Sequence, residues 1–170
     1  LPGNEVVCNA GRFLAEVSAC LGNRDGVLTG WNSICKNCKS ENLNLPENGL
    51  AFWEIYANIN ASNFSAAVAL CEELGGLDVN DKSILDAYWW ALDEIDRTAD
   101  AIPVAEKLVA SIEDRSPLFY NLGYLCGKDS SFGKSKYYYE EELKINAGNV
   151  MAWENLAFIH LLKGDVSRAE

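Results

Sequence analysis

The stretch that decides the fold covers residues 116–170, SPLFYNLGYLCGKDSSFGKSKYYYEEELKINAGNVMAWENLAFIHLLKGDVSRAE. Within it, Asn121-Leu122-Gly123 recurs as Asn155-Leu156-Ala157, and Phe119 is matched by Trp153 at the same shift. Self-similarity at a fixed period indicates stacked copies of one supersecondary unit. We therefore expect a repeat architecture.

This shift matches the period of the tetratricopeptide repeat (TPR), a helix-turn-helix unit of about 34 residues. Residues 116–170 resemble two successive TPR repeats, the second incomplete, with helices expected over 118–126, 133–145 and 150–162. Ser116 is expected to cap the first of these helices, with Pro117 in its first turn. The resemblance implies an all-α, right-handed superhelical solenoid of antiparallel helix hairpins.

Residues 49–115 are predicted to be degenerate TPR-like hairpins. Apolar periodicity indicates helices over 50–59, 64–74, 81–97 and 104–112. Pro103 comes just before the last of these helices, and the first turn of a helix tolerates proline. Aligning Ala67 with Ala105 gives an interval longer than the TPR period, which suggests an insertion.

Residues 1–48 are predicted to be a cysteine-containing helical N-terminal segment. A helix is expected over 4–21, where Phe13, Leu14, Val17 and Leu21 belong to an apolar stripe. The segment 24–44 is rich in Gly, Asn, Ser and Lys, and only a short helix over 29–38 is expected there. It is the least TPR-like part.

The net charge limits which classes of partner the protein is expected to bind. The 170 residues carry a net charge of −11, and residues 51–100 hold ten of the 25 acidic side chains. Nucleic acids and anionic membranes favour Lys and Arg, so a basic or neutral protein or peptide is the expected partner, not nucleic acid. No apolar run reaches the roughly 20 residues of a membrane span.

Cysteines offer the main alternative chemistry. Cys35-Lys-Asn-Cys38 has the spacing of a zinc half-site, but the remaining candidates, Cys8 and Cys20, are far apart in sequence and have no nearby His, so no metal site is predicted. Cys8, Cys20, Cys35 and Cys38 are candidates for disulfides, with three complete pairings open. Cys71 and Cys126 lie on apolar helix faces and are expected to be buried thiols.

Enzymatic motifs are missing from the sequence. The single histidine, His160, falls where the repeat family places a packed aromatic residue, and no hydrolase motif or phosphate-binding glycine loop is present. We therefore expect no catalytic residues and no cofactor.

The resemblance implies a concave groove lined by the first helix of each hairpin. The side chains expected on it are Tyr120, Asn121, Tyr124, Lys128, Glu154, Asn155 and Phe158. In the family, asparagines at positions such as 121 and 155 hold a peptide backbone, since an amide donates and accepts. Lys128 is the only basic residue of the set, which disfavours the carboxylate-clamp version of the family.

The predicted function is that of a non-catalytic scaffold or adaptor that binds a protein or peptide in this groove. Two alternatives stay open: a regulatory or docking segment of a larger multidomain enzyme, and an extracytoplasmic module stabilised by disulfides or metal. The chain starts at Leu1 and ends within an expected helix, which suggests part of a longer protein. Its compartment is left undecided.

Overall fold

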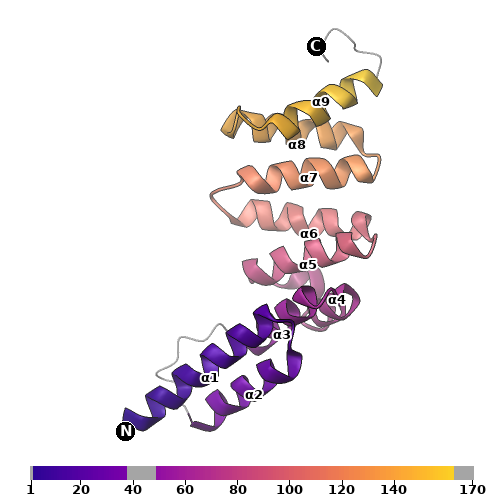
Figure 1. Ribbon diagram of the computed structural model, residues 1–170. Coiled ribbons are helices and arrows are strands. Elements are labelled where there is room, and N and C mark those ends of the chain that lie inside the picture. The colour runs from indigo at the N-terminus through magenta and orange to yellow at the C-terminus, as the bar shows by residue number, and fades with distance from the viewer. Residues whose placement is uncertain (1, 38–48, 163–170) are drawn as a thin grey trace. The chain divides into compact units, whose positions relative to one another are not determined.

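The computed structural model describes the backbone of residues 2–37 and 49–162, and the side chains of 11–34 and 49–162. Every regular element in these ranges is helical (Figure 1), so the all-α prediction is confirmed. The elements are α1 (Pro2–Cys20), α2 (Arg24–Asn37), α3 (Gly49–Asn60), α4 (Phe64–Glu73), the 3₁₀ turn η2 (Gly76–Asp78), α5 (Lys82–Glu94), α6 (Thr98–Ser111), α7 (Ser116–Lys128), α8 (Phe132–Ile145) and α9 (Val150–Leu162).

The helices form two compact units, Leu1–Ile95 with α1 to α5 and Asp96–Glu170 with α6 to α9. In the first unit α3 packs against α1, α2, α4 and α5. In the second, α6, α7, α8 and α9 pack on one another in chain order (Figure 1). The division of the chain at residues 48 and 115 stays a prediction.

One turn geometry joins the paired helices. Gly22, Ser62 and Ser130 each adopt a left-handed φ, of 65°, 57° and 61°. The residue that follows each of them donates its N–H to a carbonyl in the last turn of the preceding helix: Asn23 N to Ser18 O at 2.7 Å, Asn63 N to Asn58 O at 2.8 Å, and Ser131 N to Cys126 O at 2.8 Å. This is the Schellman motif, which satisfies carbonyls at a helix end.

The left-handed residues also set the repeat register. Ser62, Asp96 and Ser130 are equally spaced along the chain, at the same period that relates Asn121 to Asn155, and Asp96 has a φ of 60°. This register aligns Ala67 with Ala101, both fully buried, rather than with Ala105. The longer interval expected from the sequence was therefore wrong, and no insertion separates these turns.

The position of Pro103 explains why the start of α6 was predicted wrongly. Pro103 lies inside this helix, which begins at Thr98 instead of 104. A proline beyond the first turn removes one backbone hydrogen bond. The exposed Pro103 is tolerated because the opposite side of α6 buries Ala101, Ala105 and Leu108.

Glycines explain the second correction, which concerns α2. The helix covers Arg24–Asn37, whereas only 29–38 was expected. Asn23 Oδ1 accepts the N–H of Gly26 at 3.1 Å and starts the helix. A Cβ on Gly26, in the part of α2 that was not expected, would lie 2.3 Å from Ser18 Oγ, and a Cβ on Gly30 would lie 2.5 Å from Gly11 O and 2.7 Å from Ala15 N. Glycine lowers helix propensity, but here it lets the backbones of α1 and α2 touch.

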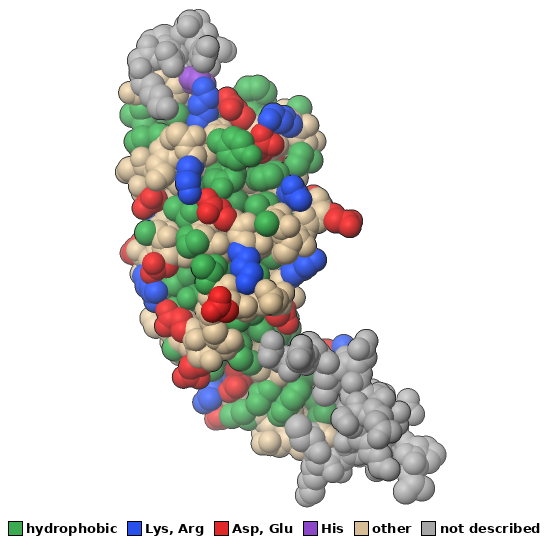
Figure 2. Space-filling model, turned by 180° about the vertical axis from the view of Figure 1, so that it is seen from behind, with side chains coloured by type: hydrophobic (Ala, Val, Ile, Leu, Met, Phe, Trp, Pro, Cys, Tyr) green, Lys and Arg blue, Asp and Glu red, His purple; other side chains and the backbone are tan. Residues whose placement is uncertain are grey.

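This close packing turns the small side chains of α1 inward. Ala15, Ser18 and Ala19 are buried, whereas Phe13 and Leu21 are 68% and 76% exposed. The apolar stripe expected on this helix, including Leu14 and Val17, therefore faces outward over its described part. Exposed hydrophobic side chains are not confined to α1: on the face drawn in Figure 2, they are interspersed with acidic and basic side chains.

A buried carboxylate ties α7, α8 and α9 together. Glu142 on α8 is 1% exposed, and its oxygens accept from Ser116 Oγ at 2.9 Å and Asn149 Nδ2 at 2.9 Å. Asn149 Oδ1 in turn accepts the N–H of Ala152 at 3.2 Å, in the first turn of α9. Ser116 was expected to cap α7, but Arg115 holds the N-cap position and the serine hydroxyl serves Glu142 instead.

The three cysteines whose side chains the structure describes are free thiols. Cys71 and Cys126 are fully buried, as predicted, and Cys20 is exposed. The side chains of Cys8 and Cys35, and all of Cys38, fall outside the description, so pairing among these cysteines stays a prediction. His160 is buried on α9, as its expected packing role requires.

Alkylation should separate these thiols by rate. Burial, and secondarily Glu72, raises the pKa of Cys71 to about 12, and burial raises the pKa of Cys126 to about 11. Because the thiolate is the nucleophile, at pH 8 we expect iodoacetamide to modify Cys20 well before Cys71 and Cys126 in folded protein. Peptide mass mapping at successive times measures this, with denatured protein as the control; equal rates for Cys20 and Cys71 in the folded state would contradict it.

Candidate functional site

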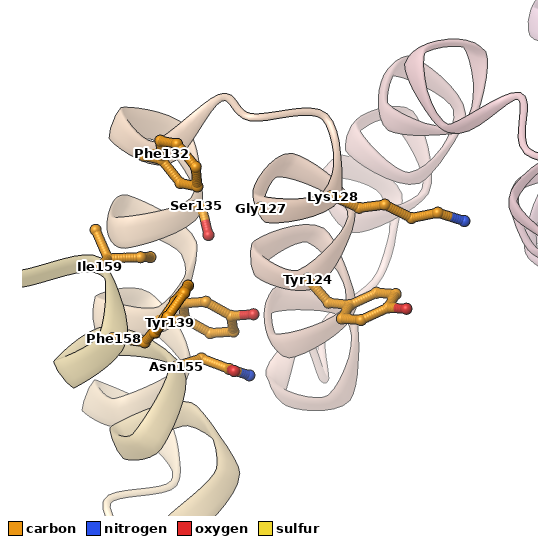
Figure 3. Close-up of a pocket in the computed structure, with 9 residues that line it drawn as sticks. All are labelled: Tyr124, Gly127, Lys128, Phe132, Ser135, Tyr139, Asn155, Phe158 and Ile159. Carbon is orange, nitrogen blue, oxygen red and sulfur yellow. The ribbon is translucent and has the colours of Figure 1, made fainter. Parts of the chain in front are cut away.

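A cavity of about 300 Å³ lies among α7, α8 and α9, all within the second unit (Figure 3). It is mainly apolar, with a few polar groups. Its lining consists of Tyr124, Gly127, Lys128, Phe132, Ser135, Tyr139, Asn155, Phe158 and Ile159.

Gly123 on α7 shapes the wall that α8 contributes. A Cβ at this position would lie 2.6 Å from the ring of Tyr139, so only glycine lets that ring lie against α7. Ser135, one turn earlier on α8, donates its hydroxyl to Gly123 O at 2.6 Å. These contacts fix the Tyr139 side chain, which is 3% exposed.

Tyr139 stays a neutral phenol. Burial, followed by the nearby Tyr120, raises its pKa well above the ordinary value, while hydrogen bonding to Ser135 and Asn155 acts in the opposite direction. Figure 3 shows the side chains of Tyr139 and Asn155 pointing toward α7. The cavity thus places a phenol hydroxyl and a carboxamide near each other within apolar walls.

Four of the seven side chains predicted for the groove line this cavity, namely Tyr124, Lys128, Asn155 and Phe158. Tyr120, Asn121 and Glu154 do not line it. Tyr120 instead packs on Tyr139, with ring centroids 5.8 Å apart, and its hydroxyl donates to Met151 Sδ at 3.9 Å. Asn121 is half-buried and Glu154 is exposed.

Lys128 is engaged elsewhere. Its Nζ lies 3.3 Å from Asp96 Oδ1, and in Figure 3 both Lys128 and Tyr124 extend away from Asn155 and Phe158. Lys128 and Tyr124 therefore contribute to the rim, and the lysine charge is neutralised by Asp96.

The contribution of α8 to the site was not predicted from the sequence. Phe132, Ser135 and Tyr139 belong to a second helix of a hairpin, and only first helices were expected to face the groove. Ser135 could have indicated this contribution, because the small residues Ala67, Ala101 and Ser135 recur at the repeat period and mark equivalent positions on second helices.

The lining chemistry suits binding. Its polar groups are the hydroxyls of Ser135, Tyr124 and Tyr139, the carboxamide of Asn155 and the ammonium of Lys128, all of which can form hydrogen bonds. In the described part of the chain, no three His, Cys, Asp or Glu side chains gather as metal ligands. A volume of about 300 Å³ is at the small end for ligand sites, which suits one or two side chains.

Solved structures share the fold. The structure titled MamA 41-end from Desulfovibrio magneticus RS-1 matches with a TM-score of 0.74 and 17% identity, covering 95% of this chain and 88% of that chain. A crystal structure of MamA protein gives a TM-score of 0.74 at 16% identity, covering 96% and 86%, and the structure titled MamA MSR-1 C2 gives 0.73 at 10%, covering 95% and 90%. No family model and no curated protein matches the sequence. The fold is thus of the TPR type.

Proposed function

We propose that this protein is a non-catalytic interaction scaffold, and that the α7–α9 cavity receives an apolar side chain from a peptide segment of a partner protein. The observation that carries the proposal is that one cavity has exposed aromatic side chains at its rim and a carboxamide in its lining. Phe158 is 58% and Tyr124 49% exposed at the rim, while Asn155 is half-buried beside Tyr139.

Each part of the cavity has a role in this proposal. Phe158 and Tyr124 supply apolar area that is costly to leave in water, and aromatic residues dominate binding hot spots. The Asn155 carboxamide both donates and accepts, so it pairs with a peptide group of an extended segment. The Tyr139 hydroxyl, neutral at physiological pH, is a further donor.

The charge of the chain supports a basic or neutral partner. With a net charge of −11, long-range attraction favours a cationic protein and disfavours nucleic acid. No helix of the described residues is long and apolar enough to cross a bilayer. From the charge, we propose a basic or neutral protein or peptide as the partner, one of whose side chains enters the cavity.

Photo-crosslinking from the rim tests this proposal. A benzophenone amino acid at position 158 is expected to give a discrete crosslinked partner, with the crosslink in one short segment of it. The matched position is 145 on α8, because Ile145 is equally exposed at 57% but does not line the cavity. The same products from both positions would count against the cavity.

A further inference from the structure

A second surface, chemically unlike the cavity, lies on α5 in the first unit. Trp89 and Trp90 both direct their indole N–H groups to carboxylates of the same helix. Trp89 Nε1 donates to Asp86 Oδ1 at 3.0 Å, and Trp90 Nε1 donates to Glu94 Oε1 at 3.1 Å. Trp90 is 43% exposed. Residues three and four apart share a helix side, so these four groups form one face.

Neighbouring helices extend this face with aromatic rings. Tyr56 on α3 lies close enough to Asp86 for the carboxylate to help raise its phenol pKa, after burial as the larger cause. Phe52 packs on Tyr56 with ring centroids 4.7 Å apart, and the ring of Phe64 on α4 lies 6.1 Å from that of Trp90. Asp86 is thus an exposed carboxylate beside Tyr56 and Trp89.

Charge around this face is strongly negative. Residues 51–95, which belong to the first unit, contain eight acidic side chains and one basic one, Lys82 at the start of α5. Asp86 and Glu94 are both exposed, so neither carboxylate is buried within the fold. The negative charge instead complements a cation.

We propose that the aromatic–carboxylate face, formed by Tyr56, Asp86, Trp89, Trp90 and Glu94, binds an arginine or lysine side chain of a basic partner segment. The face of an indole ring attracts cations more strongly than any other side-chain ring. Each carboxylate gives one interaction to an indole N–H and keeps further lone pairs for the incoming cation.

Arginine should bind this face better than lysine. Its planar guanidinium stacks on an aromatic ring and pairs with a carboxylate through two parallel N–H groups at once, whereas an ammonium is a strongly hydrated point charge. The face uses none of the residues of the α7–α9 cavity. A failure of this inference therefore leaves the proposed function of the cavity unaffected, and the reverse also holds.

Calorimetric titration of the full chain tests the inference with three short acetylated and amidated peptides. They share a Gly-rich sequence and carry two arginines, two lysines or two neutral citrullines. We expect the arginine peptide to bind about fivefold or more tightly than the citrulline peptide, with the lysine peptide between them. Equal affinity of the arginine and citrulline peptides would overturn the inference.

Matched variants locate the binding. Trp90→Leu is expected to weaken binding of the arginine peptide about threefold or more, whereas Trp153→Leu removes a similarly exposed tryptophan from α9 and should leave affinity unchanged. The double variant Asp86→Asn with Glu94→Gln keeps side-chain shape and should also weaken binding, more than Glu73→Gln on α4 does. Equal effects of Trp90→Leu and Trp153→Leu, or no effect of the double variant, would refute the site.

Discussion

Replacing Glu142 by alanine is expected to lower the free energy of unfolding by about 2–4 kcal/mol. The carboxylate is 1% exposed and accepts hydrogen bonds from Ser116 and Asn149. Without it, both donors lose their partner inside the protein, and the turn that starts α9 loses its anchor. Urea denaturation followed by circular dichroism measures the change.

Glu140→Ala is the matched control for this prediction. Glu140 is two positions away on the same helix and exposed, with an ion pair to Lys136 at 3.6 Å that has little effect on stability. We expect a change of at most about 0.5 kcal/mol for this variant. Equal destabilisation by the two substitutions would show that Glu142 does not hold α7, α8 and α9 together.

Gly30→Ala is expected to destabilise the first unit by about 1–3 kcal/mol, although alanine favours helix by about 1 kcal/mol over glycine. The new methyl group would meet backbone atoms, Gly11 O at 2.5 Å and Ala15 N at 2.7 Å. Backbone cannot rotate away as a side chain can, so α1 and α2 must separate. Thermal melting and urea unfolding both report the loss.

The same substitution at Gly133 should have the opposite sign. Nothing lies within 4 Å of a Cβ at this position in the first turn of α8. Gly133→Ala is therefore expected to stabilise the protein, by up to about 1 kcal/mol. If Gly30→Ala were stabilising too, the close contact of α1 with α2 would be wrong.

Helix positions could be predicted from sequence where apolar periodicity and packing agree. The bounds of α9 are those expected, and those of α3, α4 and α8 differ from expectation by a single position at one or both ends. The expected end of α5 at 97 was wrong, because the helix ends at Glu94. The two largest errors lie where a residue opposes local helix propensity but serves packing. Gly26 concealed the start of α2, and Pro103 concealed residues 98–103 of α6. Such residues are explained only by the helix that packs on them.

The candidate site was predictable only in part. The repeat identified Asn155 and Phe158, because equivalent positions of a repeat share a helix face. It could not distinguish Asn155 from Asn121, since the two differ only in what the neighbouring helices place beside them. The position of Tyr139 could not be predicted either, because it depends on the missing side chain of Gly123 on another helix.

The difference between the two asparagines provides the most direct test of the cavity as a peptide-binding site. The dissociation constant of the crosslinked partner segment, as a synthetic peptide, is measured for wild type, Asn155→Ala and Asn121→Ala, with melting curves for all three. We predict about tenfold weaker binding for Asn155→Ala, wild-type binding for Asn121→Ala, and closely similar melting. Equal losses of affinity in both variants, or a loss that follows the melting temperature, would contradict the account.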